Sequence, residues 1–185
     1  PKHLFQNISI SGKNVSKVIK NSKISAVTLT GSTPAGRSVA ETSGKELKKT
    51  VLELGGSDPY VILDDADIEK SVDSCINGRI LNTGQSCISA KRLIVVDSLH
   101  DQFLSSLEQK LSIKIMGDPK DDVDIGPMVS IEAREEVHQQ VLKSIEGGAK
   151  VIIGGEIPKI PGAFYPITLL SNVEPGVVAF DEEIF

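Results

Sequence analysis

Two hydrophobic periods alternate along the chain, one typical of helices and the other typical of strands. Apolar residues that recur every three or four positions predict helices over residues 13–21, 67–80 and 99–111, and between Ser130 and Gly147. Runs rich in β-branched residues predict strands over residues 25–30, 49–54, 60–63, 92–96, 150–153 and 164–170. The last of these carries a proline, which is typical of an edge strand or a bulge. Because strands and helices alternate, the pattern favours an α/β architecture with a mostly parallel sheet.

The first predicted strand leads into Gly31-Ser32-Thr33-Pro34, which is the pattern of a helix start. It places a capping hydroxyl and a proline at the beginning of the helix. Free N–H groups and the positive end of the helix dipole would then point outward from the carboxyl edge of the strand, and such an end attracts phosphate. The lysine of a P-loop is absent, so these residues alone are also compatible with a plain strand-turn-helix that has no phosphate site.

The two cysteines lie in unlike surroundings. Cys75 shares a helical apolar stripe with Val72 and Ile76, and we expect it to pack as an inert thiol in a core. Cys87 lies among small and polar residues in Thr83-Gly84-Gln85-Ser86-Cys87, which indicates a turn. An exposed thiol in a glycine-bounded loop is suited to nucleophilic catalysis, because the thiolate is strongly nucleophilic.

A candidate base precedes a second turn. Glu53 comes just before Gly55-Gly56, where the strand over residues 49–54 must end. Strand ends are where α/β proteins gather their chemistry, so two such turns can face each other. The chain therefore pairs a thiol nucleophile, Cys87, with a carboxylate base, Glu53.

Composition narrows the class of protein. The 185 residues are 39% hydrophobic and 24% charged with a net charge of −5, which offers no basic surface for nucleic acid and no polybasic membrane anchor. No apolar run is long enough to span a bilayer, and the opening residues are not a signal peptide. His3, His100 and His138 are isolated, so we expect surface histidines and no metal site. Two unlike cysteines indicate a reducing compartment, and we expect a cytoplasmic protein.

Four motifs resemble those of the aldehyde dehydrogenase superfamily, in the order of that family and over essentially the whole chain. They are Thr30-Gly31-Ser32, Glu53-Leu54-Gly55-Gly56, Gly84-Gln85-Ser86-Cys87 and Glu182-Glu183-Ile184-Phe185. The stretches 31–37 and 54–60 are most similar to the succinate-semialdehyde dehydrogenase branch. The family's N-terminal portion is missing and the last motif normally continues with Gly-Pro, so we expect a fragment.

The resemblance implies a division into two domains and a reaction. Residues 1–55 would be the C-terminal part of a Rossmann-like cofactor-binding domain. Residues 56–185 would be an incomplete catalytic domain with the family's three-layer parallel-sheet architecture. The implied reaction is NAD(P)-dependent oxidation of an aldehyde, in which Cys87 forms a thiohemiacetal and then a thioester and Glu53 is the general base. The parent enzyme is expected to be a homo-oligomer.

The resemblance also assigns residues to the cofactor, which is NAD or NADP. Gly31 and Ser32 would lie near the pyrophosphate and the nicotinamide. Leu54 would lie near the nicotinamide amide, and Glu183 would bind the hydroxyls of the nicotinamide-side ribose. The family's asparagine that stabilises the oxyanion would lie outside this chain, so we expect the 185 residues alone to bind NAD or NADP weakly and to be inactive.

The substrate is less well defined. Some succinate-semialdehyde enzymes carry an arginine six residues before the nucleophile, where it can grip a substrate carboxylate, but here that position is Leu81. Arg79 is a possible substitute, although on a helix it would point about 200° away. Two other functions stay open. One is a cysteine hydrolase or acyltransferase, disfavoured because no histidine base is evident, and the other is a non-catalytic folding or oligomerisation module.

Overall fold

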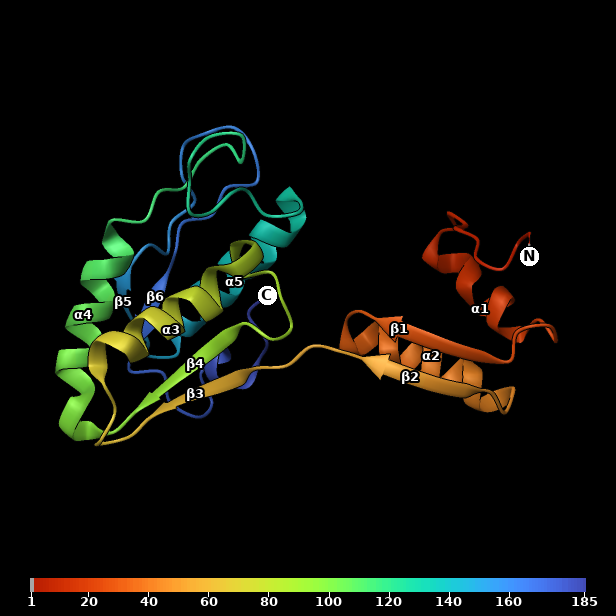
Figure 1. Cartoon of the computed structure of the whole chain (residues 1–185), viewed down its shortest axis with the longest axis horizontal. Coiled ribbons are helices and arrows are strands. Elements are labelled where there is room, and N and C mark those ends of the chain that lie inside the picture. Colours follow the sequence, from red (N-terminus) through yellow and green to blue (C-terminus); the bar gives the residue numbers. More distant parts are fainter. Residues whose placement is uncertain (1) are drawn as a thin grey trace. The chain divides into compact units, whose positions relative to one another are not determined.

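In the computed structural model, which describes residues 2–185, the chain divides into two units, Pro1–Gly55 and Gly56–Phe185 (Figure 1). The first unit contains two helices and two strands, α1 (Gly12–Lys20), β1 (Ala26–Thr30), α2 (Thr33–Lys45) and β2 (Lys49–Glu53). β1 and β2 pair in parallel, with Thr30 opposite Glu53, so both strands end at the same edge. The Lys48 ammonium donates to the main-chain oxygens of Ile19 and Asn21, which holds the end of α1 against the start of β2.

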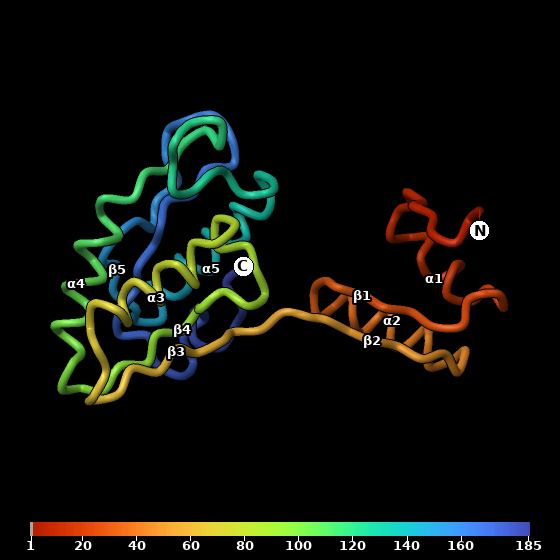
Figure 2. Tube along the Cα trace, viewed as in Figure 1, coloured from red at the N-terminus to blue at the C-terminus, as the bar shows by residue number. Residues whose placement is uncertain are grey.

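The second unit begins with a βαβ crossover, which Figure 2 traces from β3 (Asp58–Ile62) through α3 (Ile68–Ile80) to β4 (Ala90–Val95). β3 and β4 pair in parallel, as expected for strands joined by a crossover helix. The Asp67 side chain caps α3 by accepting from the Lys70 N–H at 3.0 Å. The remaining α-helices and strands are α4 (His100–Ser112), α5 (Ile131–Glu146), β5 (Lys150–Ile153), β6 (Leu169–Ser171) and α6 (Val178–Asp181), and two short 3-10 helices span Leu81–Gly84 and Asp97–Leu99.

The main core of the second unit lies where α3 and α4 pack against the strands. Val72 and Cys75 of α3 are buried there with Phe103 and Leu107 of α4 and with Ile62 of β3. A smaller cluster joins Val141 of α5 to Met128 and Tyr165. The structure is thus mixed α/β with parallel strand pairs, as the sequence pattern predicts. None of the helices within residues 2–185 is both long enough and apolar enough to cross a bilayer.

Two expectations from the sequence need correction. The strand expected over 164–170 is much shorter, because pairing begins only at Leu169, three residues after Pro166, which has no N–H to donate. β5 and β6 pair antiparallel, which the expected mostly parallel arrangement allows, because the other two strand pairs are parallel. His138 is not a plain surface residue, because it is partly buried and its Nδ1 lies 3.0 Å from the Tyr165 hydroxyl.

Candidate active site

The loop that carries Cys87 joins α3 to β4 through a sharp turn. Asn82, Thr83 and Gly84 are consecutive residues with φ angles of 52°, 57° and 77°, all in the left-handed region. Glycine adopts this conformation freely and asparagine tolerates it, but a β-branched residue such as Thr83 rarely does. Such a backbone persists only where its surroundings hold it in place.

Two hydrogen bonds from a distant segment hold this loop. The Gly126 N–H donates to the Thr83 hydroxyl at 3.2 Å, and the Val129 N–H donates to the Gln85 side-chain oxygen at 2.8 Å. Both donors lie on the segment that leads into α5. The motif Thr83-Gly84-Gln85 therefore does more than turn the chain, because its polar side chains anchor the loop that presents the thiol.

Cys87 is exposed on this loop, whereas Cys75 is buried in α3 with 2% of its surface exposed, and both environments confirm the sequence-based expectation. Burial raises the pKa of the Cys75 thiol to about 11, which keeps it protonated near neutral pH. Among the hydrogen bonds that the structure contains within residues 2–185, none is donated by the Cys87 N–H. A thiol and an uncommitted N–H on one residue suit attack on a carbonyl carbon and binding of the resulting oxyanion.

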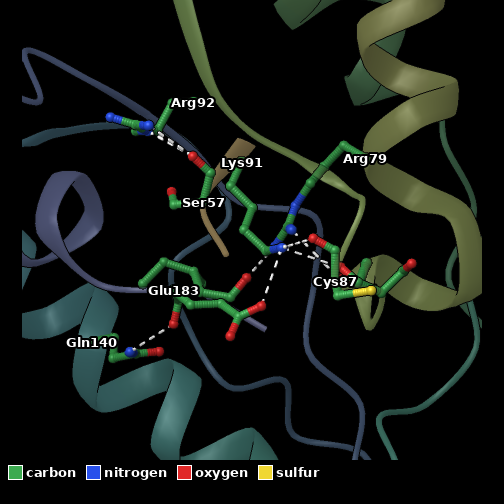
Figure 3. Close-up of polar contacts among 10 residues, drawn as sticks. Ser57, Arg79, Cys87, Lys91, Arg92, Gln140 and Glu183 are labelled. Carbon is green, nitrogen blue, oxygen red and sulfur yellow. Dashed lines mark hydrogen bonds and ion pairs between the residues drawn. The ribbon is translucent and has the colours of Figure 1, made fainter. Parts of the chain in front are cut away.

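Glu183 lies beside the Cys87 loop, and Lys91 connects the two (Figure 3). The Lys91 Nζ donates to the main-chain oxygens of Cys87 at 2.9 Å and of Ser86 at 3.1 Å. The same Nζ lies 3.3 Å from Oε1 of Glu183. The side-chain amide of Gln140 on α5 holds the main chain at Glu183 by donating to its carbonyl oxygen at 3.0 Å.

Arg79 provides a second connection between the same two segments. Its guanidinium donates to the Gly84 oxygen at 3.4 Å and to the Ile184 oxygen at 3.2 Å. Burial lowers the pKa of Arg79, and the negative charge of Glu183 opposes this shift. Because main-chain oxygens occupy this guanidinium, its arrangement favours a structural role over the grip on a substrate carboxylate that the sequence suggested.

The other candidate residues lie in the first unit, at the carboxyl edge of its strands. The Gly31 N–H donates to the Glu53 main-chain oxygen at 3.0 Å, so the turn after β1 meets the end of β2. The Glu53 side chain is exposed in this unit. Leu54 packs on α2 at Gly36, where a Cβ atom would lie 2.6 Å from the Leu54 Cδ2.

Ser32 caps α2, as the sequence predicts, by accepting from the Ala35 N–H at 3.4 Å. Pro34 has no N–H, and the Gly36 N–H donates to the Ser32 main-chain oxygen. The anion-binding capacity of this helix end therefore resides in the Thr33 N–H, the helix dipole and the Ser32 hydroxyl. This donor set fits a phosphate group.

The structure gathers the six candidate residues in two places. Gly31, Ser32, Glu53 and Leu54 lie at one strand edge of the first unit, and Cys87 and Glu183 lie near one another in the second. Sequence reasoning missed two residues of the second group, Lys91 and Gln140. A lysine four residues after Cys87 is the available signal for the first, but no local pattern distinguishes Gln140.

A cavity of about 290 Å³ in the second unit is lined mainly by apolar side chains of α3, β4 and α5. Arg79, Gly84 and Lys91 contribute to its wall, whereas Cys87 does not. The cavity thus adjoins the base of the Cys87 loop and not the thiol, and we assign no substrate to it.

Comparison with known proteins identifies the family. The model of the aldehyde dehydrogenase family matches residues 1–185. The chain belongs to the aldehyde dehydrogenase family. It is 45% identical to succinate-semialdehyde dehydrogenase [NADP(+)] of Deinococcus radiodurans and 42% identical to succinate semialdehyde dehydrogenase [NAD(P)+] Sad of Escherichia coli. Both alignments cover the whole chain, but only 39% and 40% of these relatives, so the chain spans about two fifths of their length.

Solved structures agree with this membership. Succinic semialdehyde dehydrogenase from Streptococcus pyogenes, in complex with NADP+, superimposes with a TM-score of 0.91 at 38% identity, covering 95% of this chain and 39% of that one. The structure described as showing cofactor and substrate selection by Gox0499 superimposes with a TM-score of 0.93 at 38% identity, covering 96% of this chain and 39% of that one. The fold of this chain is therefore that of the aldehyde dehydrogenases, and this confirms the fold expected from the sequence.

Proposed function

We propose that this chain supplies the nucleophile and part of the cofactor site of an NAD(P)-dependent aldehyde dehydrogenase. The observation that carries the proposal is the exposed Cys87 thiol on a loop held by Thr83 and Gln85, with the Glu183 carboxylate beside it. Membership of the aldehyde dehydrogenase family supports the reaction class. In this proposal residues 1–55 contribute Gly31, Ser32 and Leu54 to cofactor binding and the base Glu53 to catalysis, and residues 56–185 contribute the nucleophile Cys87 and the cofactor residue Glu183.

The first half of the reaction needs a nucleophile and a site for the oxyanion. The Cys87 thiolate adds to the aldehyde carbon, and the electron pair of the carbonyl moves to oxygen to form the thiohemiacetal anion. The Cys87 N–H is placed to donate to that oxygen. When bound, oxidised NAD(P) would accept the hydride that the carbon of this anion loses as its oxygen re-forms the C=O bond. The Cys87 sulfur would then be left in a thioester.

The second half of the reaction needs a base. Glu53 takes a proton from water, the hydroxide oxygen attacks the thioester carbon, and the carbon–sulfur bond breaks to release the acid and the Cys87 thiolate. Glu53 is exposed at a strand end of its own unit, so water can reach its carboxylate, and this access supports the role.

The residues present fit a dinucleotide. Oε1 of Glu183 is buried beside Lys91, whereas the side chain as a whole is 26% exposed, so the rest of the carboxylate has acceptor capacity for ribose hydroxyls. The capped start of α2 at Ser32 fits a phosphate. In this assignment Gly31 and Ser32 bind the pyrophosphate side, Leu54 contacts the nicotinamide amide and Glu183 binds the nicotinamide-side ribose.

The proposed substrate is a small aliphatic aldehyde, and succinic semialdehyde is the first candidate to test. The names of the Deinococcus and Escherichia relatives support this choice. The chain itself offers no cation for the substrate carboxylate at Leu81, and Arg79 is committed to main-chain oxygens.

Replacement of the nucleophile tests the proposal. In the longest expressed form of the protein, Cys87→Ser should lower NADP-dependent oxidation of succinic semialdehyde by at least about a thousandfold, because a serine hydroxyl is not ionised near neutral pH. Cys75→Ala is the matched control and should retain activity, since Cys75 is buried in α3. Turnover by Cys87→Ser close to the parental rate would remove Cys87 from the mechanism.

A further inference from the structure

Lys91 is an almost fully buried ammonium on β4, with only 2% of its side chain exposed. A buried charge is stable only when its donors are satisfied and an opposite charge lies close by. Two of its three donors go to the main-chain oxygens of Ser86 and Cys87. The third side of the ammonium faces Oε1 of Glu183 at 3.3 Å.

The contact with Glu183 is held by charge and not by a well-directed hydrogen bond. Oε1 of Glu183 is buried and accepts no hydrogen bond, although it lies within ion-pairing distance of Lys91. The Glu183 side chain as a whole is 26% exposed, so its open surface lies away from Oε1. One oxygen is thus directed to Lys91, and the rest of the carboxylate is free for a ligand hydroxyl.

We infer that Lys91 is a positioning residue that sets Glu183 and the Cys87 loop at a fixed separation. This inference rests on the proposed function, in which Glu183 binds the cofactor ribose and Cys87 attacks the aldehyde. A single rigid cation that contacts both segments makes the placement of the carboxylate depend on the placement of the nucleophile loop (Figure 3). Lys91 itself touches neither substrate nor cofactor.

A merely structural lysine would satisfy the Ser86 and Cys87 oxygens and have no particular relation to Glu183. The two possibilities differ in a double-mutant cycle. If Lys91 acts through Glu183, then Lys91→Met and Glu183→Gln each lower kcat/KM for NADP about tenfold, and the double variant is also about tenfold lower, because both changes remove one interaction. Independent roles would make the double variant about a hundredfold lower, and that result would overturn the inference.

A conservative replacement of Lys91 and a control variant far from the Cys87 loop extend the double-mutant cycle. Lys91→Arg retains the charge and should stay within about threefold of the parental kcat/KM, since a guanidinium can also bridge carbonyl and carboxylate oxygens. Lys110→Met removes the exposed pairs of Lys110 with Glu69 and Asp73 on α3 and should leave kcat/KM unchanged. A loss for Lys91→Arg as large as that for Lys91→Met would overturn the positioning role.

Amide hydrogen exchange gives a readout that does not need activity. The Gln85 and Ser89 N–H groups report the Cys87 loop, and the Glu182 N–H, which donates to the Val178 oxygen at 2.9 Å, reports the other segment. Lys91→Met should speed exchange at all three by at least about threefold, because both segments lose their common contact. If Lys91→Met does not fold, the same measurement is made on Glu183→Gln. This variant should speed amide exchange at Ser89.

These outcomes separate the inference from the proposed function. A parental protein without aldehyde oxidation whose exchange still responds in both segments would retain the Lys91 coupling and reject the dehydrogenase proposal. A fully active protein would retain the dehydrogenase proposal but overturn the coupling in either of two cases. In the first, Lys91→Met leaves amide exchange unchanged in one of the two segments. In the second, Glu183→Gln leaves amide exchange at Ser89 unchanged.

Discussion

Gly36 of α2 lies so close to Leu54 that an added Cβ atom would be 2.6 Å from Cδ2 and 2.7 Å from Cδ1 of that leucine. The absence of a side chain at Gly36 is what lets Leu54 lie against the helix just after β2. The position of Leu54, which we propose as a cofactor contact, therefore depends on the absence of a side chain at Gly36.

We predict that Gly36→Ala forces the Leu54 side chain out of its place. The cost should be about 1 kcal/mol of unfolding free energy, at the low end for overpacking because a leucine end can rotate. Gly44→Ala in the same helix is the control, since nothing lies within 4 Å of a Cβ there, and it should be neutral or stabilise by up to about 1 kcal/mol. Urea unfolding followed by far-ultraviolet circular dichroism measures both, and equal effects would contradict the contact.

Replacement of the proposed base should separate the two halves of the reaction. Glu53→Gln should let the thioester form faster than it hydrolyses, because an amide cannot take a proton from water. Mass spectrometry of quenched reactions should then detect an acyl group on Cys87. Glu41→Gln, which changes an exposed glutamate of α2, should show no such accumulation. A burst of reduced cofactor without any acyl adduct would mean that Glu53 is not the deacylation base.

The two thiols should differ sharply in reactivity. At about pH 8, iodoacetamide should label Cys87 at least about tenfold faster than Cys75, because alkylation needs an accessible thiolate. Burial raises the pKa of Cys75 to about 11, so its thiolate becomes abundant only as the pH approaches that value. Peptide mapping after timed labelling measures the ratio, and preferential labelling of Cys75 would show that the 185-residue chain does not hold α3 in this core.

Local patterns predicted much of the fold and the surroundings of individual residues. The sequence predicts the Ser32 cap, the buried Cys75 and the exposed Cys87 correctly, because each depends on neighbours within one or two turns of chain. Hydropathy overestimates the length of the strand over 164–170, since it does not show where Pro166 prevents pairing. The sequence does not indicate the partly buried position of His138, because its partner Tyr165 lies 27 residues away.

The sequence by itself determined the alternation of strands and helices, the order of the four motifs and the different surroundings of Cys87 and Cys75, on which the proposal of Cys87 as nucleophile rests. Only the tertiary structure decided that Lys91 meets Glu183, that Arg79 is committed to the oxygens of Gly84 and Ile184, and that β5 pairs antiparallel with β6. The physical reason is that hydropathy and capping act between near neighbours. A buried cation instead finds its carboxylate only when packing brings distant segments together and excludes water from the space between them.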